Sequence, residues 1–233
     1  MKEQFMVVCN ANSGSDWLSP ILARRVASGP QKYWQKEFFN PITNNRFAEE
    51  LSPVFPSESA IGYENFGVRL TDDLIQRVLN PIYRKTWAQL DYTFNKEAYT
   101  PNFTRWYASK FNVVGLVRTT EDLFPPTKAR TWATYETMWL GLRKNGWVLF
   151  HSESMKSRAM EAHRVMREFL MQELADIGAP VLHYETMVSG SESEVTDEAR
   201  RIGWLDVEGF VQDVMESRDS DKAARLAKIS AYA

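Results

Sequence analysis

A small polar loop near the start of the chain combines residue types suited to binding an anion. It follows an uncharged apolar run, residues 5–9, that is typical of a strand buried on both faces. Glycine tolerates unusual dihedrals and serine can cap a helix, so the loop is expected to lead into a helix over 16–27. The free N–H groups and dipole of that helix start favour phosphate or sulfate, although many strand-to-helix turns share this geometry. The candidate anion-binding residues in the loop and at the start of the helix are Asn12, Ser13, Gly14, Ser15, Asp16 and Trp17.

A second candidate is Arg118, which directly follows the apolar run 111–117. Open α/β sheets bind ligands at the carboxyl ends of their strands, and the planar guanidinium suits a phosphate bidentately. The alternative is a structural ion pair with Glu121 or Asp122, which would contribute little on a surface.

Regular elements that would position these residues are visible along the chain. A third strand is expected over 179–187, including Tyr184 and Glu185. Residues 147–150 are either a short strand or an extension of the preceding helix. Pro81 is expected to kink or divide its helix. Apolar spacing predicts further helices over 71–91, 99–107, 127–144, 155–177, 191–202 and 206–217.

Three motifs together, in this order, resemble the sulfotransferase superfamily across residues 5–205. They are the Ser13-Gly14-Ser15 loop, the strand ending in Val117-Arg118 with Asp122-Leu123-Phe124 after it, and Tyr184-Glu185-Thr186-Met187. The resemblance implies a three-layer α/β sandwich of the P-loop NTPase-like kind, with a central, mostly parallel sheet flanked by helices. It also implies 3′-phosphoadenosine 5′-phosphosulfate (PAPS) as co-substrate, and no metal.

The resemblance also suggests roles for individual residues. The loop from Asn12 to Trp17 would hold the 5′-phosphosulfate, and Arg118 with Thr127 would hold the 3′-phosphate. Thr127 would replace the family's serine, whose position is taken by Pro126. Glu37-Phe38-Phe39 is similar to a segment whose glutamate deprotonates the acceptor hydroxyl, so Glu37 is the candidate base. The other interpretation of Glu37 is an acidic residue on a solvated loop.

Two departures from the family leave the reaction open. Asn12 stands where the family has Lys or Arg, and Asp16 where it usually has Thr, and both changes weaken the attraction for a polyanion. The chain is therefore expected to transfer a sulfuryl group from PAPS to an acceptor hydroxyl, or else to be a catalytically inactive nucleotide- or partner-binding protein on the same fold. A P-loop kinase or NTPase is disfavoured because the Gly-x-x-x-x-Gly-Lys-Ser/Thr pattern is missing.

Composition sets the remaining bounds. The 233 residues suit a single α/β domain over 1–217, with an irregular excursion at 29–70 and a tail at 218–233. A net charge of -2 creates no overall field that would recruit nucleic acid or an anionic membrane.

No apolar run approaches the length of about 20 residues that a membrane span needs, and no leader is visible. A cytoplasmic location is therefore expected. Cys9 is expected to be a buried hydrophobe, with a catalytic thiol as the alternative, and His151, His163 and His183 are too widely spaced to indicate a metal site.

Overall fold

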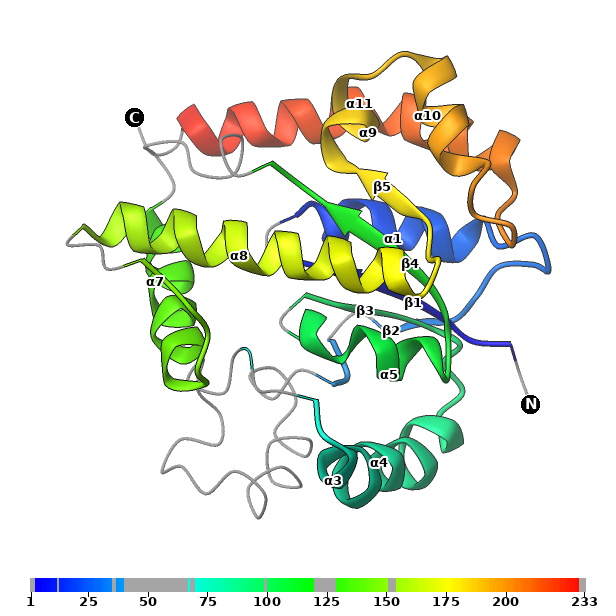
Figure 1. Ribbon diagram of the computed structural model, residues 1–233. Coiled ribbons are helices and arrows are strands. Elements are labelled where there is room, and N and C mark those ends of the chain that lie inside the picture. Colours follow the sequence, from blue (N-terminus) through cyan, green and yellow to red (C-terminus); the bar gives the residue numbers. More distant parts are fainter. Residues whose placement is uncertain are drawn as a thin grey trace.

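A five-stranded, all-parallel sheet forms the centre of the molecule (Figure 1). The computed structural model describes residues 3–11, 13–34, 37–39, 67, 70–98, 100–119, 129–150 and 154–230, without the side chains of 129–131 and 219–230. The order across the sheet is β2-β3-β1-β4-β5. Helices cover both faces, which confirms the predicted α/β class with a parallel sheet flanked by helices. The strands are β1 Phe5–Cys9, β2 Tyr33–Trp34, β3 Phe94–Glu97, β4 Asn112–Val117 and β5 Val181–His183.

The central strand β1 is completely buried, as its uncharged sequence predicts. Successive side chains of a strand point to opposite faces, so β1 contributes to two separate cores. Phe5, Val7 and Cys9 pack on one face, and Met6 and Val8 pack on the other.

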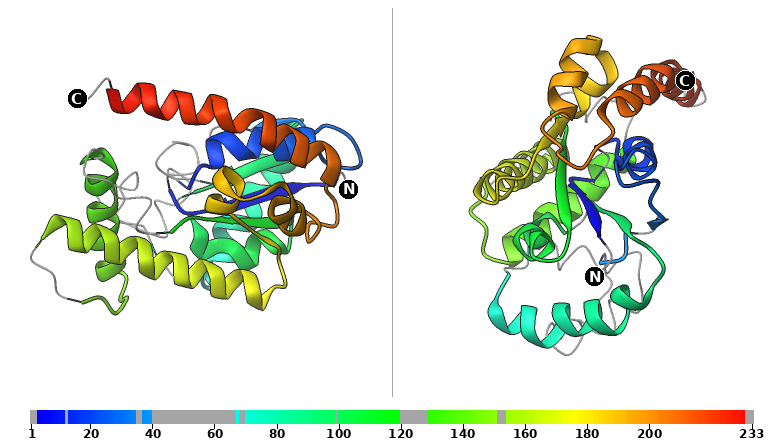
Figure 2. Two further views of the ribbon diagram at one scale, coloured as in Figure 1. Left: turned by 90° about the horizontal axis from the view of Figure 1, so that it is seen from above. Right: turned by 90° about the vertical axis from the view of Figure 1, so that its right-hand side faces the viewer.

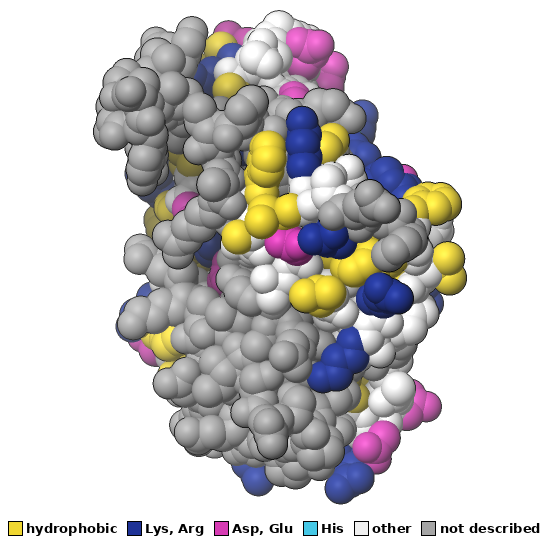
Figure 3. Space-filling view, turned by 90° about the vertical axis from the view of Figure 1, so that its left-hand side faces the viewer, with side chains coloured by type: hydrophobic (Ala, Val, Ile, Leu, Met, Phe, Trp, Pro, Cys, Tyr) yellow, Lys and Arg dark blue, Asp and Glu magenta, His cyan; other side chains and the backbone are white. Residues whose placement is uncertain are grey.

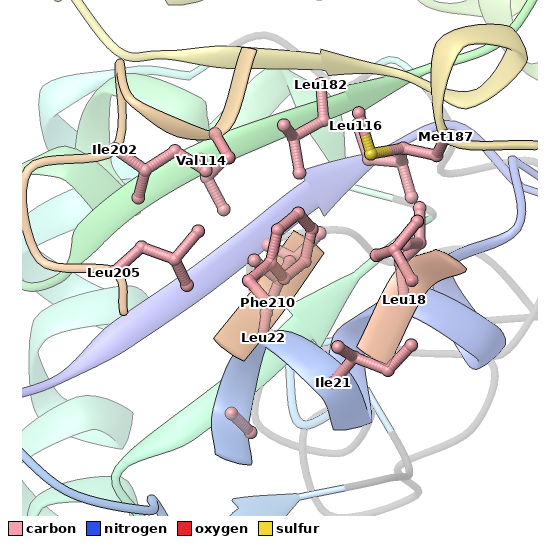
Figure 4. Close-up of a cluster of buried hydrophobic side chains, with 14 of the residues drawn as sticks. Leu18, Ile21, Leu22, Val114, Leu116, Leu182, Met187, Ile202, Leu205 and Phe210 are labelled. Atoms are coloured by element: carbon pink, nitrogen blue, oxygen red, sulfur yellow. The ribbon is translucent and has the colours of Figure 1, made fainter. Parts of the chain in front are cut away.

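The first core lies between the sheet and the helices that follow β1 and β5. Figure 4 shows its packing, in which Leu18 and Leu22 meet Val114 and Leu116 of β4 and Phe210. The helices of this layer are α1 Ser15–Arg24, α9 Tyr184–Ser189, α10 Glu192–Ala199 and α11 Val207–Ser230.

The second core lies on the opposite face, beneath the helices between β2 and β4 and beneath the long helix α8 (Figure 2, right). A third cluster joins α7 to α8. The elements of this layer are α3 Asp72–Leu74, η2 Ile75–Leu79, α4 Asn80–Lys85, η3 Trp87–Gln89, η4 Pro101–Phe103, α5 Thr104–Ala108, α7 Ala129–Lys144 and α8 Met155–Asp176.

The helix predicted over 71–91 is continuous from Asp72 to Lys85 and is not divided at Pro81. Thr71 caps its start by accepting a hydrogen bond from Leu74 N at 3.2 Å, and the turn just before the proline widens into a π-helix, η2. Proline lacks the N–H that an α-helix would use at this point, which accounts for a local change of hydrogen-bond register.

Several details differ from the sequence-based expectations, among them the short strand β2 within residues 29–70, which were expected to be irregular. Strand β3 was not anticipated, because three of its four residues are polar: Asn95, Lys96 and Glu97. Strand β5 ends at His183, so Tyr184 and Glu185 begin helix α9 instead of ending a strand. Residues 147–150 adopt neither of the two conformations considered for them. Helix α11 continues to Ser230, well beyond residue 217.

The strands that follow β1 in the chain, β2 and β3, lie on one side of it in the sheet, and β4 and β5 lie on the other side. After β1 the chain enters α1 on one face, and after β4 it goes on to α7 and α8 on the other face. In open α/β sheets such a switch point opens a crevice at the carboxyl ends of the two strands, where ligands bind. Arg118 and the loop before α1 both lie at this edge. Within the described parts of the chain, no helix is long and apolar enough to cross a membrane.

Candidate functional site

A buried lysine, Lys96, lies beside the start of α1. It is the third residue of β3, which pairs directly with β1, and only 5% of the residue is exposed. Its Nζ lies 2.9 Å from Glu37 Oε1 and also forms an ion pair with the Asp16 carboxylate. Tertiary structure thus joins the predicted base Glu37 and the loop residue Asp16 through a cation from a third segment.

The ammonium group of Lys96 stays charged in this setting. Burial by itself would lower its pKa, but Glu37 and the hydrogen-bonded Asp16 outweigh that effect, so the pKa lies well above its usual range. Lys96 therefore places a positive charge near the loop, whose own described residues include no lysine or arginine.

Glu37 is buried and does not lie on a solvated loop. Its backbone has φ 53°, a left-handed conformation that is uncommon for residues other than glycine. Phe38 and Phe39 follow it into the second core. The carboxylate is consequently held against Lys96 by the burial of its neighbours.

Cys9 lies at the carboxyl end of β1, near the same charges. Burial raises the pKa of its thiol to about 11, although Lys96 acts in the opposite direction. The Sγ is 3.6 Å from the carbonyl oxygen of Glu97. The thiol is therefore protonated at neutral pH, which suits the buried hydrophobe and not the catalytic nucleophile.

Gly14 is the N-cap of α1 and contacts Tyr184 of α9. It has φ 88°, and no side chain caps the helix start. A Cβ at this position would lie 2.2 Å from Tyr184 Cε2, so only glycine fits beneath the ring. The first-turn N–H groups of α1 at Ser15 and Asp16 have no acceptor within the helix itself.

Arg118 lies against the same tyrosine. It is 5% exposed, and its Cζ is 4.3 Å from the centroid of the Tyr184 ring, within range of a cation–π contact. Next to it, Thr119 donates two hydrogen bonds to Glu185 Oε1, from N at 2.8 Å and from Oγ1 at 3.1 Å. The Tyr184-Glu185 pair therefore joins the loop after β1 to the end of β4.

Two arginines, Arg118 and Arg167 of helix α8, lie close enough to His163 to affect its pKa. His163 is fully buried and packs edge-on against Tyr135 with the ring centroids 5.2 Å apart. Burial, reinforced by Arg167 and Arg118, lowers the pKa of His163 to about 3. The histidine is therefore neutral, and the charge here belongs to the two arginines.

The remaining predicted residues have more varied surroundings. Ser13 and Ser15 are buried next to Cys9. Trp17 donates from Nε1 to Ser217 Oγ at 3.0 Å and so packs α1 against α11. Asn12 and Thr127 lie outside the described residues.

Glu97 is a buried carboxyl group that sequence reasoning missed. Its Oε1 accepts hydrogen bonds from Phe39 N at 2.7 Å and from Asn95 Nδ2 at 2.8 Å. Burial, reinforced by Glu37, raises the pKa of Glu97 well above its usual range. The available signal was the polar trio Asn95-Lys96-Glu97 between apolar residues, just before Thr100-Pro101.

An open groove of about 870 Å³ lies at the other end of the sheet. Its lining includes Gln4 and Asn112, at the amino ends of β1 and β4, with Tyr83 and Lys110. It does not coincide with the buried cations described above.

Among the described residues, no group of three or more His, Cys, Asp or Glu side chains could hold a metal ion. Comparisons of the chain with family models, curated proteins and solved structures found no match.

Proposed function

We propose that this chain is a sulfotransferase-like protein that binds PAPS at the carboxyl edge of its sheet and transfers the sulfuryl group to an acceptor hydroxyl. In this proposal the loop before α1 and Lys96 hold the 5′-phosphosulfate. Arg118, with Arg167 nearby, holds the 3′-phosphate. The strongest support is that Lys96 and Arg118, both buried, belong to or directly follow the two strands that flank β1.

A buried cation needs a compensating anion, and the two carboxylates that pair with Lys96 differ in their exposure to solvent. Glu37 is as buried as Lys96, whereas the Asp16 side chain is 89% exposed. An exposed carboxylate can leave the ammonium at little cost. A phosphosulfate could therefore replace Asp16 as the partner of Lys96, while the free N–H groups of α1 face the same ligand.

The proposed transfer requires few protein groups. The bond between sulfur and the bridging phosphate oxygen breaks, and its electron pair stays on that oxygen. A new bond forms between sulfur and the acceptor oxygen, whose proton passes to Glu37. Lys96 stabilises the negative charge on the transferred and leaving groups, and positioning supplies most of the rest.

One observation favours the second candidate, a nucleotide- or partner-binding protein without transferase activity. Asp16 and Glu37 together place two carboxylates on Lys96, so the cation near the loop is already neutralised. If Asp16 stays in place when a nucleotide binds, no charge remains for the sulfuryl group. The two candidates share the binding site and differ in the fate of Asp16.

Calorimetric titration with 3′,5′-adenosine bisphosphate tests the shared site. We expect saturable binding that Arg118→Ala weakens by about tenfold or more, because a charge-assisted contact is removed. The matched control is Arg24→Ala, which removes an arginine whose side chain is exposed and bound to Asp213 at 2.8 Å. Absence of binding at millimolar ligand would overturn the transferase and any nucleotide-binding role.

Transfer of labelled sulfate from PAPS to a panel of hydroxyl acceptors separates the candidates. We expect Asp16→Thr to increase transfer and Glu37→Gln to abolish it while bisphosphate binding persists. Binding without transfer, in the wild type and in Asp16→Thr alike, would favour the non-catalytic protein.

A further inference from the structure

The segment after α7 exposes large apolar side chains in an alternating pattern. Val148 is 95% exposed and Phe150 is 76% exposed, whereas Trp147 and Leu149 pack against the α7–α8 core. Trp147 Nε1 donates to the Gly67 carbonyl oxygen at 2.7 Å, and its ring meets Phe169 edge-on at 5.0 Å between centroids. The inward residues thus anchor the segment and hold the outward pair in solvent.

Basic residues flank this apolar pair in the sequence. Arg143 and Lys144 form the last turn of α7, and Met155 and Lys156 form the start of α8; all four are exposed. Figure 3 looks onto this end of the molecule and shows Lys and Arg side chains interspersed with hydrophobic ones. We call these four residues, with Val148 and Phe150, the α7–α8 tip.

The charge near the tip is opposite in sign to that of the whole chain. Over residues 132–160 the sequence has four basic residues and two acidic ones, Glu136 and Glu153. Glu136 is paired with Arg158 at 3.1 Å, which leaves the three basic residues of the tip in excess over the one remaining acidic residue. The chain as a whole carries -2, so the positive charge is local.

We propose that the α7–α8 tip docks on an anionic lipid surface, with Val148 and Phe150 inserted among the acyl chains and Arg143, Lys144 and Lys156 at the headgroups. Exposed apolar residues beside lysine and arginine are the combination that interfacial membrane binding uses. This mode needs no membrane-spanning helix, and it does not depend on the function proposed above.

The observations favour lipid over a protein partner. A second copy joined through the same surface would bring two basic clusters together, which repel each other. A stable protein interface buries about 800 Å² on each partner, more than a few separate side chains on a turn provide. A lipid surface supplies negative charge and apolar depth at once.

Co-sedimentation of the full chain with vesicles tests the proposal. We expect binding to vesicles of phosphatidylcholine containing phosphatidylserine, weak binding to phosphatidylcholine alone, and release by high salt. Phe150→Ser should lower the partition coefficient about tenfold, because one apolar side chain no longer inserts. Arg143→Glu with Lys144→Glu should lower it about fivefold or more for each basic residue lost.

Two exposed basic residues elsewhere on the molecule provide a control for the change in net charge that the tip substitutions cause. Arg84 and Lys85 also form the last turn of a helix, α4, and both are exposed. Arg84→Glu with Lys85→Glu should leave vesicle binding nearly unchanged. Circular dichroism should show every variant folded, because all the substituted side chains lie in solvent.

Three results would overturn the proposal. The first is no binding to either kind of vesicle, and the second is equal loss of binding in the tip and α4 variants. The third is concentration-dependent dimerisation that Phe150→Ser abolishes without any vesicle binding, which would assign the tip to contact between copies.

Discussion

The Nζ of Lys96 on β3 and the Oε1 of Glu37 lie 2.9 Å apart, and both side chains are 7% exposed. A buried ion pair of this kind is sensitive to the loss of one partner, because the remaining charge is left without compensation in a low-dielectric setting. Its position at the carboxyl edge of the sheet makes it both a structural element and the centre of the candidate site.

Removing both partners of the pair should destabilise the protein by less than the sum of the two single losses. We expect Glu37→Gln and Lys96→Met each to lower the free energy of unfolding by about 3 kcal/mol, and the double variant to cost less than the sum of the two. Urea denaturation of the four proteins measures this coupling. Lys32→Met is the control, since Lys32 and Asp91 form an exposed pair at 3.0 Å that should contribute no more than about 1 kcal/mol. Additive effects of Glu37→Gln and Lys96→Met would contradict the buried pair.

The contact between Gly14 and Tyr184 predicts a steric effect that can be separated from backbone strain. Gly14→Ala should be strongly destabilising because the residue has φ 88° and its new Cβ would overlap the Tyr184 ring. Gly29 has φ 114°, but a Cβ added there would have no atom within 4 Å, so Gly29→Ala reports the dihedral strain alone, about 1 kcal/mol. Thermal and urea unfolding measure both variants. Equal losses would show that Tyr184 yields freely.

His163 predicts a specific loss of stability in mild acid. Its folded-state pKa, lowered to about 3 mainly by burial, lies below that of the unfolded chain, so the unfolded state binds the extra proton first as the pH falls. The contribution of His163 is complete above pH of about 6.5 and should fall by about 2 kcal/mol between there and pH 5. Between pH 7 and pH 5 the wild type should therefore lose about 2 kcal/mol of unfolding free energy relative to His163→Gln.

The comparison with His163→Gln is essential because Glu97 changes the stability of the protein with pH in the opposite direction to His163. Its raised folded-state pKa means that the native state keeps a proton that the unfolded state loses, so stability from Glu97 decreases as the pH rises above the unfolded value. Both proteins in the comparison contain Glu97, so its effect cancels. Identical pH dependence in the wild type and His163→Gln would contradict the buried neutral histidine.

Cys9 should be inert in the folded protein. Its thiol is fully buried and its pKa is raised to about 11, so the reactive thiolate is scarce and inaccessible at pH 8. We expect iodoacetamide to label Cys9 only as fast as the protein unfolds, with full labelling in urea. Mass spectrometry over time measures the rate. Rapid labelling of the native chain would instead indicate an accessible thiolate.

The elements whose apolar residues repeat with a clear period could be predicted from the amino-acid sequence alone. The buried strands β1 and β4 and the helices α1, α7 and α8 were predicted because their burial appears directly in residue type. The same reasoning missed β3, because Asn95, Lys96 and Glu97 are polar and become stable inside only through partners elsewhere in the chain. Local pattern cannot show a compensation that is supplied from a distance.

Site residues divide in the same way. Residue type singled out Gly14, Glu37 and Arg118. The contacts of Tyr184 with Gly14 and Arg118, and the pairing of Lys96 with Glu37, became visible only in the folded structure. The same holds for charge, since a chain of net -2 has a basic tip once α7 and α8 are folded. Residue types set which interactions are available, but strand order and helix packing bring distant groups within the few ångströms over which hydrogen bonds and ion pairs act.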